Sequence, residues 1–214
     1  FLVCLMPFMA YPQLIANRNV VKNGYNFWLY LPKDYAAQKE KMPVIIFLHG
    51  SSLCGNDLNR VRRYGPLHAI ALGRQIEAMV IAPQNPGGSW NPQKVLNVLQ
   101  WTEKHYSLDS QRVYVIGMSL GGYGVLDFVG TYPDKVAAAM ALCGGSTLKE
   151  YCGMGTVPLW IMHGTADRAV SLNESQKVVD GIKACGNAEL LRFDTFPGVS
   201  HGGLARVLYL EETY

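Results

Sequence analysis

Six short segments of the chain are apolar at almost every successive position and end at glycine, proline or polar residues. Such segments are typical of strands that are buried on both faces, as in a parallel sheet. The predicted strands are 44–48, 78–82, 113–116, 136–142, 158–162 and 189–193. Before them, residues 20–31 read as two strands around Lys22-Asn23-Gly24, which is a hairpin signal.

Helical patterns separate the later strands. Asn91 followed by Pro92 is a typical helix start and predicts a helix to about His105. Residues 120–131 and 172–185 have helical spacing and end before Pro133 and at Gly186. A hairpin followed by alternating strands and helices predicts one α/β domain, residues 14–214, with a mostly parallel central sheet and helices on both faces.

Composition narrows the class of protein. About half of the 214 residues are apolar (49%), so the chain can bury a full core, which excludes a disordered protein. The formal net charge is only +3 and no basic run occurs, whereas a nucleic-acid binder of this size normally carries a clustered basic stripe. We therefore expect no nucleic-acid partner.

The two ends of the chain carry separate expectations. Residues 1–10 are almost wholly apolar and do not begin with Met, so we interpret residues 1–13 as the remnant of a secretory signal peptide with a cleavage region near Ala10. A buried first strand is the alternative. The chain stops in mid-pattern at 210–214, so we expect a truncated C-terminus. No apolar stretch approaches the roughly 20 residues that span a bilayer, so we expect no stable membrane insertion.

The five cysteines fit an exported protein in the periplasm or outside the cell. If Cys4 leaves with the signal peptide, four remain, which is compatible with two disulfides in an oxidising compartment. The sequence leaves their pairing open, with Cys143 and Cys152 as the nearest candidates and buried free thiols as the alternative. No cysteine or histidine spacing fits a zinc site, and we expect no metal.

The candidate nucleophile is Ser119. Strand 113–116 runs into Gly117-Met118-Ser119-Leu120-Gly121, and a helix follows, which is the G-x-S-x-G pattern in its required strand–turn–helix context. Side chains at the flanking glycines would collide with neighbouring backbone in so tight a turn. The backbone N–H of Leu120 can then point at a developing oxyanion. A dinucleotide-binding turn is excluded because Ser119 stands where its middle glycine would be.

A serine nucleophile needs a base and an orienting acid. In proteins whose nucleophile sits on a strand–G-x-S-x-G–helix turn, these follow the serine in the order acid, then histidine. Asp167 lies in the loop after strand 158–162, and His201 lies in a glycine-flanked loop after the last strand. Asp194 is the competing acid, because it ends the strand before His201. His49 and His163 also follow strand ends, and we interpret both as structural.

The loop after the first core strand, His49-Gly50-Ser51-Ser52, is expected to give the second oxyanion donor. Ser51 is the preferred backbone donor, with Ser52 next to it as a candidate substrate contact. Trp90 lies in the polar, glycine-rich loop 83–91, where an exposed indole could stack on a sugar or an aromatic acyl group. Packing of Trp90 against the following helix is the alternative.

These motifs together resemble the α/β-hydrolase superfamily, in its dienelactone-hydrolase and prolyl-oligopeptidase-like branch. Within it, the chain is similar to the bacterial "predicted peptidase" and feruloyl or acetylxylan esterase group. The resemblance rests on five segments, which are 48–50, 117–124, 132–134, 163–167 and 200–202. The chain departs from the group at 51–54, where a Gly-x-Gly or Gly-Glu type sequence is common, and it carries Ser119 in place of the Cys of true dienelactone hydrolases.

The resemblance implies a serine hydrolase of carboxylic esters, of the carbohydrate-linked acetyl or feruloyl kind, that needs no cofactor. Ser119, His201 and Asp167 would form its triad. One alternative is a serine peptidase of the prolyl-oligopeptidase-like type, and another is a non-catalytic binding scaffold. The sequence leaves the oligomeric state open.

Overall fold

The structure is a computed structural model that describes residues 11–207. The interpretation of residues 1–10 as part of a signal peptide therefore lies outside the described residues, as does the expectation for residues 210–214. The predicted boundary at residues 13 and 14 falls at the start of a strand, because Gln13 is the first residue of β1. Between residues 11 and 207, no helix has the length and apolar character to cross a membrane.

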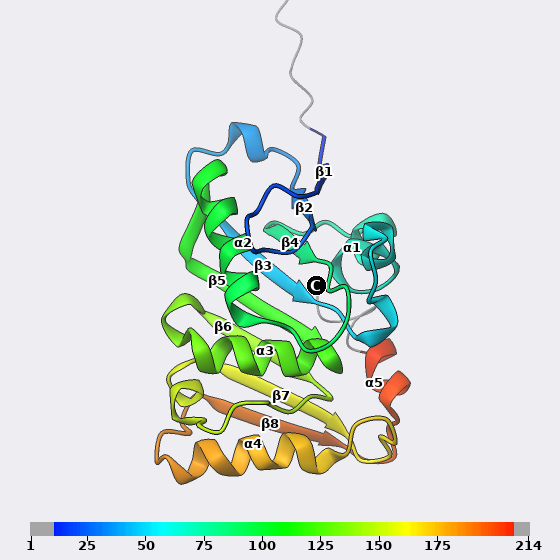
Figure 1. The fold of residues 1–214 in the computed structure, drawn as a ribbon, viewed down its shortest axis with the longest axis vertical. Helices are drawn as coiled ribbons and strands as arrows, with labels where there is room; N and C mark the ends of the chain where they lie inside the picture. Colours follow the sequence, from blue (N-terminus) through cyan, green and yellow to red (C-terminus); the bar gives the residue numbers. More distant parts are fainter. Residues whose placement is uncertain (1–10, 208–214) are drawn as a thin grey trace, which may run out of the picture.

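Eight strands form a single sheet in the order β1-β2-β4-β3-β5-β6-β7-β8 (Figure 1). β1 and β2 are antiparallel to their neighbours, and every pairing from β4 to β8 is parallel. The predicted mostly parallel sheet is confirmed. The strands are β1 (Gln13–Asn17), β2 (Phe27–Leu31), β3 (Met42–Leu48), β4 (Met79–Pro83), β5 (Leu108–Met118), β6 (Ala138–Leu142), β7 (Leu159–Gly164) and β8 (Leu191–Phe196).

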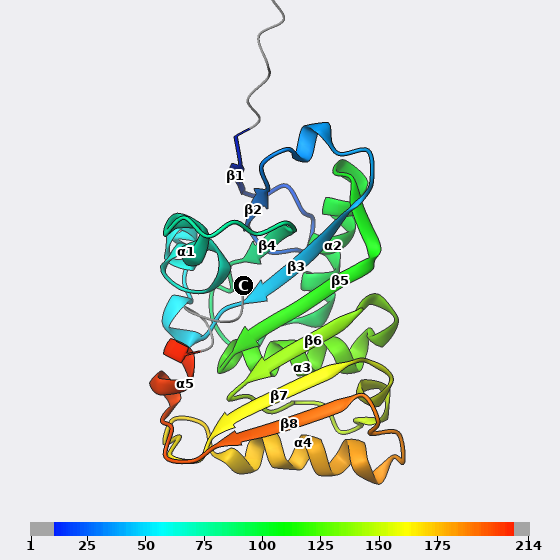
Figure 2. The ribbon, with the colours of Figure 1, turned by 180° about the vertical axis from the view of Figure 1, so that it is seen from behind.

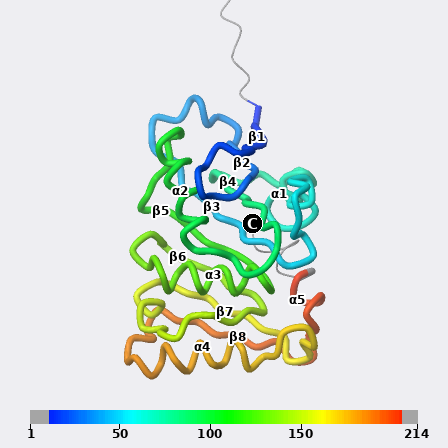
Figure 3. Tube along the Cα trace, in the orientation of Figure 1, coloured from blue at the N-terminus to red at the C-terminus, as the bar shows by residue number. Residues whose placement is uncertain are grey.

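Helices cover both faces of this sheet. The three long helices lie on one face, and the two short ones lie on the other, near the ends of β3 and β7 (Figures 1 and 2). Figure 3 shows that α5, from the C-terminal part of the described chain, returns to the side on which α1 lies. The helices are α1 (Gly65–Ala71), α2 (Pro92–His105), α3 (Leu120–Thr131), α4 (Leu172–Ala184) and α5 (His201–Val207).

Each central strand contributes to two separate cores, which explains its continuous apolar pattern. In β3, Ile46 and Leu48 face the core beneath α2 and α3. Phe47, between them, faces the second core together with Leu67 of α1 and Leu204 of α5. All three β3 side chains are at most 2% exposed, and burial of each stabilises the fold by about 1.5–3 kcal/mol.

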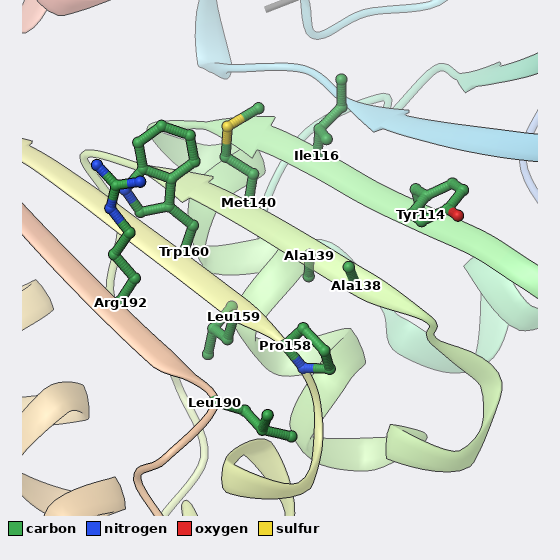
Figure 4. A pocket seen from close by; sticks show the side chains of 10 residues that line it. All are labelled: Tyr114, Ile116, Ala138, Ala139, Met140, Pro158, Leu159, Trp160, Leu190 and Arg192. Atoms are coloured by element: carbon green, nitrogen blue, oxygen red, sulfur yellow. The ribbon is translucent and has the colours of Figure 1, made fainter.

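Part of the second face carries no helix among the described residues. Over β5, β6 and β7 it forms an open, apolar pocket of about 360 Å³ (Figure 4). Trp160 and Met140 project into this region, and the Arg192 guanidinium lies 4.2 Å from the centre of the Trp160 ring. Most of its lining residues lie in the amino-terminal halves of β6, β7 and β8, and none of the candidate catalytic residues lines it.

The hairpin predicted around Lys22-Asn23-Gly24 is wrong in its first strand. β1 ends at Asn17, which pairs with Phe27, so residues 18–26 form the connection. Val20 lies in this connection and is 43% exposed. The predicted turn does form there, with the Gly24 N–H donating to the Val21 carbonyl at 3.2 Å. The apolar pair Val20–Val21 therefore belongs to the connection between β1 and β2 and not to a strand.

One disulfide joins Cys152 to Cys185, and it differs from the nearest sequence candidate. Cys143 follows β6 at the carboxyl end of the strands, whereas Cys152 begins the short helix η5 (Cys152–Thr156) that leads into the amino end of β7. Cys152 thus meets Cys185 at the end of α4. Cys143 is a buried free thiol, and Cys54 is free and half-buried.

Candidate active site

Ser119 occupies a strained turn between β5 and α3. Its backbone has φ 59° and ψ −123°, a conformation that side-chain-bearing residues rarely adopt and that costs about 1–3 kcal/mol. The turn is held in place because the Ser119 N–H donates to the Leu142 carbonyl at 2.8 Å and the Ser119 carbonyl accepts the Tyr123 N–H at 3.0 Å. The strain therefore persists at the residue that the sequence singles out as the nucleophile.

The glycines on either side of Ser119 are required by close backbone contacts. A Cβ at Gly117 would lie 2.7 Å from the carbonyl oxygen of Leu48, and a Cβ at Gly121 would overlap that same oxygen. Because Leu48 is the last residue of β3, both glycines allow the turn to pack directly against the neighbouring strand. The predicted reason for the glycines is confirmed.

The two candidate oxyanion donors lie at the same edge of the sheet as Ser119. Leu120 is the first residue of α3. Gly50 lies against the nucleophile, since a Cβ at Gly50 would be 3.6 Å from Ser119 Cβ. Ser51 follows Gly50 and begins the short helix η2 (Ser51–Leu53), where Ser51 and Ser52 are exposed.

His49 fixes the loop that carries Gly50. Its ring is fully buried, with Nδ1 2.8 Å from the Gly50 carbonyl oxygen and Nε2 accepting the Asn85 N–H at 3.0 Å. A neutral ring with its proton on Nδ1 satisfies both contacts. Burial, together with the charge of Arg60, lowers the pKa of His49 to about 4 despite the opposing effect of the Gly50 carbonyl. His49 has the structural place expected of it.

His201 and Asp167 form a short hydrogen bond. His201 Nδ1 lies 2.6 Å from Asp167 Oδ2, although 34 residues separate the two in the chain. The Asp167 side chain is fully buried and the His201 ring is 24% exposed. His201 is the first residue of α5, so the expected loop position is wrong. The helix start holds the ring, and Nε2 is left as the nitrogen that does not face Asp167.

Asp167 is kept ionised by donors that converge on its carboxylate. Burial alone would raise the pKa of this carboxyl group. The backbone N–H of Val170, the His201 ring, the backbone N–H of Ala169 and the Cys143 thiol outweigh burial and lower the pKa below its ordinary value. Oδ1 accepts both backbone N–H groups at 2.9 Å, which leaves Oδ2 for His201. A carboxylate so held orients an imidazole.

His163 packs beneath this carboxylate. It is fully buried, with Nδ1 2.7 Å from Ser175 Oγ and Nε2 3.0 Å from the Val170 carbonyl oxygen. Nε2 also lies 3.4 Å from Asp167 Oδ2. His163 therefore ties the end of β7 to α4 and to the Asp167 loop, in keeping with the structural role expected from the sequence.

Asp194, the competing acid, points elsewhere. Its Oδ2 accepts the Trp160 indole N–H at 2.8 Å and the Arg192 Nε–H at 2.7 Å, on the open face of the sheet. The structure thus brings Asp167, and not Asp194, to His201. Asp194 therefore does not end its strand as expected, because it lies within β8, whereas Asp167 follows the neighbouring β7.

The expectation that Trp90 is exposed is wrong. Trp90 is only 4% exposed, and its indole N–H donates to the His49 carbonyl at 3.2 Å. The ring meets Tyr25 edge to face and fills the space above Gly124 of α3, where a Cβ would lie 2.7 Å from the indole. The packing alternative accounts for Trp90, which supports the His49 loop from behind.

Cys143 is the site residue that the sequence reasoning missed. Between residues 11 and 207, it forms with Asp167 and His201 the one group of three potential metal ligands, whose ligand atoms lie within 4.8 Å of one another. Burial raises the pKa of the Cys143 thiol to about 12, so it stays protonated at neutral pH and is a poor metal ligand. The sequence feature that points to Cys143 is its position at the end of a predicted strand, directly before Gly144-Gly145.

A mostly parallel sheet, a strained serine between strand and helix, and an Asp–His pair at the same edge together define an α/β-hydrolase fold. The chain belongs to the dienelactone hydrolase family, whose model matches residues 88–207. That match includes Ser119, Asp167 and His201, and it leaves the Gly50–Ser51 loop outside.

Curated relatives include several esterases. The chain is 26% identical over 153 residues to acetylxylan esterase A of Aspergillus ficuum, which covers 64% of this chain and 48% of that protein. It is 23% identical over 159 residues to the bifunctional acetylxylan esterase/xylanase XynS20E of Neocallimastix patriciarum, covering 71% of this chain and 22% of that protein. The chain spans about half the length, or less, of these relatives.

Solved structures share the fold at low sequence identity. A thermostable esterase superposes with a TM-score of 0.71 at 23% identity, covering 87% of this chain and 55% of that one. The feruloyl esterase module of Clostridium thermocellum, complexed with sinapinate, superposes with a TM-score of 0.69 at 18% identity. This second match covers 93% of this chain and 86% of the module.

Proposed function

We propose that this protein is a serine hydrolase that cleaves carboxylic esters through Ser119, His201 and Asp167. The observation that carries the proposal is the 2.6 Å contact between His201 Nδ1 and Asp167 Oδ2 at the edge where the strained Ser119 lies. A serine hydroxyl needs such a paired base, because it is a weak nucleophile near neutral pH. Family membership and the esterases among the relatives support the same reaction.

The reaction follows from these positions. Ser119 Oγ attacks the ester carbonyl carbon, and its proton passes to His201 Nε2 while Asp167 stabilises the imidazolium. The tetrahedral intermediate then collapses, and the alcohol leaves with the proton from His201. Water attacks the acyl-enzyme by the same proton transfers in reverse, which frees the acid and restores Ser119. The cycle needs no cofactor.

The oxyanion is held by the backbone N–H groups of Leu120 and Ser51. Leu120 begins α3, so its N–H lies at the positive end of the helix dipole. Ser51 is next to Gly50, which lies against Ser119. Loss of one such donor typically costs about 3–4 kcal/mol of transition-state stabilisation. The Gly50 carbonyl is held by the His49 ring, and this fixes the peptide plane that carries the Ser51 N–H.

The proposed substrates are carbohydrate-linked acetyl or feruloyl esters. Support comes from the relatives named acetylxylan esterase and from the feruloyl esterase module with a similar fold. We also propose that the protein acts in the periplasm or outside the cell. The Cys152–Cys185 disulfide supports this location, since such bonds persist in oxidising compartments.

A substrate panel with a matched nucleophile variant tests the proposal. Purified protein and Ser119→Ala are compared on an aryl acetate, methyl ferulate, acetylated xylan and a peptide anilide. We expect ester turnover by the wild type and a fall of about a millionfold in Ser119→Ala, with an unchanged circular dichroism spectrum.

Other outcomes separate the alternatives. Ester turnover that persists in folded Ser119→Ala would contradict the assignment of the nucleophile. Faster cleavage of the peptide anilide than of the esters would favour a peptidase. A folded wild type that turns over none of the four compounds would favour a binding scaffold.

A further inference from the structure

Cys143 keeps a side chain at a position where glycine would fit the backbone better. Its φ is +48°, in the left-handed region that non-glycine residues enter at a cost, and Gly144 and Gly145 follow it. The chain must turn sharply here because Gly144 packs against the backbone of Gly122 in α3. A side chain at this strained, fully buried position points to a role for the thiol itself.

The thiol lies between two groups of the Asp167 loop. The Gly164 backbone N–H lowers the pKa of the Cys143 thiol and the Asp167 carboxylate raises it, as expected of a donor to Sγ and of an acceptor for the S–H group. Cys143 Sγ, an Asp167 carboxylate oxygen and a His201 ring nitrogen all lie within 4.8 Å of one another. The end of β6 is thus connected to the proposed acid and, through it, to the proposed base.

Three groups from three different elements face the Asp167 carboxylate besides its own loop. They are the Cys143 thiol after β6, the His163 ring at the end of β7 and the His201 ring at the start of α5. Within the loop, Ala169 and Val170 hold Oδ1. The thiol adds a donor that does not belong to the loop, so it resists rotation and displacement of the carboxylate.

We propose that Cys143 is a positioning residue for the triad, whose S–H group holds the Asp167 carboxylate in the orientation that receives the His201 ring. The inference rests on the proposed serine hydrolase function. The thiol serves as a donor across the working pH range, because burial raises its pKa to about 12. It takes no part in bond making and acts only through Asp167.

Three substitutions test this role. Cys143→Ser keeps a donor, Cys143→Ala removes it, and Cys143→Gly removes it while relieving the left-handed backbone. Loss of a hydrogen bond to a charged group is large enough to change a rate about tenfold. We therefore expect kcat on an aryl acetate to fall about tenfold in the Ala and Gly variants with KM unchanged, and to stay within about threefold in Cys143→Ser.

The pH profile separates positioning from loss of packing. Without the thiol donor, protonation of the Asp167–His201 pair becomes easier, so the acidic limb of kcat/KM should move to higher pH in the Ala and Gly variants. Cys143→Ser should keep the wild-type limb. Val178→Ala, in the buried face of α4, removes core volume elsewhere and should lower thermal stability without moving the limb.

A readout without substrate keeps this test independent of the proposed reaction. The His201 Nδ1–H proton, which bonds Asp167, should give the most downfield imidazole signal in the proton NMR spectrum. We expect it to shift in Cys143→Ala and Cys143→Gly and to stay in place in Cys143→Ser. An unchanged signal and pH limb in folded Cys143→Gly would overturn the positioning role. A shifted signal in a protein without esterase activity would instead leave the role standing and contradict the proposed function.

Discussion

The two edges of the sheet are built on different principles. The carboxyl edge holds two non-glycine residues with left-handed backbone, Ser119 and Cys143, and a set of buried polar side chains around Asp167. The amino edge holds the Cys152–Cys185 disulfide and solvent-exposed ion pairs such as Arg112–Asp109. Buried polar groups and two strained residues thus lie where the chemistry is proposed, and the disulfide lies at the opposite edge.

The difference indicates how one sheet can carry a strained site. Each strained residue costs about 1–3 kcal/mol. The disulfide closes a loop with a sequence separation of 33, and a cross-link of that length stabilises a fold by about 3–4 kcal/mol. The free energy that the disulfide contributes at the amino edge is therefore of the same order as the free energy that the two strained residues cost at the carboxyl edge. Substitution of the proposed catalytic groups should therefore affect activity, and removal of the disulfide should affect stability.

After substitution of Ser119 itself, the largest expected effect belongs to Asp167 at the carboxyl edge. Asp167→Asn should lower kcat about ten-thousandfold, because the amide no longer holds the imidazole in the correct tautomer or stabilises its charge. Asp194→Asn is the matched control on the neighbouring strand and should retain kcat within about threefold, since Asp194 contacts Trp160 and Arg192 instead. Steady-state kinetics on an aryl acetate measure both. Equal losses in the two variants would break the comparison.

At the amino edge, the double substitution Cys152→Ala and Cys185→Ala should reduce the free energy of unfolding by about 3–4 kcal/mol. Activity below the melting temperature should be unchanged, because the disulfide lies at the opposite end of the strands from Ser119. Urea denaturation and ester turnover on the same samples report the two properties. A large loss of turnover in the folded variant would show that the edges are coupled.

His49, at the carboxyl edge, should make the free energy of unfolding depend on pH. In the folded protein the pKa of His49 is lowered to about 4, whereas an unfolded histidine titrates near 6.5. Between these values the unfolded state binds a proton that the native state does not, so stability is full above about pH 6.5 and falls as the pH drops to about 4. The expected contribution is about 3 kcal/mol.

The matched variant His49→Gln should remove this part of the pH dependence. Its free energy of unfolding, measured by urea denaturation at pH 7 and pH 4, should change less between the two values than that of the wild type. Identical pH dependence in the two proteins would mean that the buried His49 ring is not the titrating group.

The smallest effect is expected at the exposed ion pair of the amino edge. Arg112 is 45% and Asp109 24% exposed, and such pairs contribute little because water and salt screen them. Arg112→Ala should change the melting temperature by no more than about 2 °C. A shift as large as that of the disulfide variant, measured by thermal denaturation, would show that the amino edge depends on its charges as well as its cross-link.

The sequence predicts those parts of the site that depend on local pattern. Ser119 and its glycines lie within five residues, and the parallel strands and three long helices follow from continuous apolar runs and helix caps. His201 and Asp167 are also predicted to meet, because each follows a strand whose end must reach the same edge of a parallel sheet, and the structure brings their side chains together. These inferences need only the rule that the carboxyl ends of parallel strands lie at the same edge of a sheet.

Other features depend on contacts between distant segments. The choice of Asp167 over Asp194 requires the direction of two side chains, and the burial of Trp90 requires the absence of a side chain at Gly124. The sequence also does not show that Cys143 stays a free thiol near Asp167 instead of forming a disulfide with Cys152. Val20 is apolar like a strand residue, but it is exposed, and apolar character alone does not show whether other residues bury it.

Mapping of a fluorophosphonate probe tests the central claim most directly. The probe forms a covalent bond with a serine only where a paired base removes the hydroxyl proton. We expect one adduct, located by peptide mass spectrometry at Ser119, with labelling much slower in Asp167→Asn and unchanged in Asp194→Asn. A folded protein that stays unlabelled, or an adduct at another residue, would contradict the assignment of Ser119, His201 and Asp167.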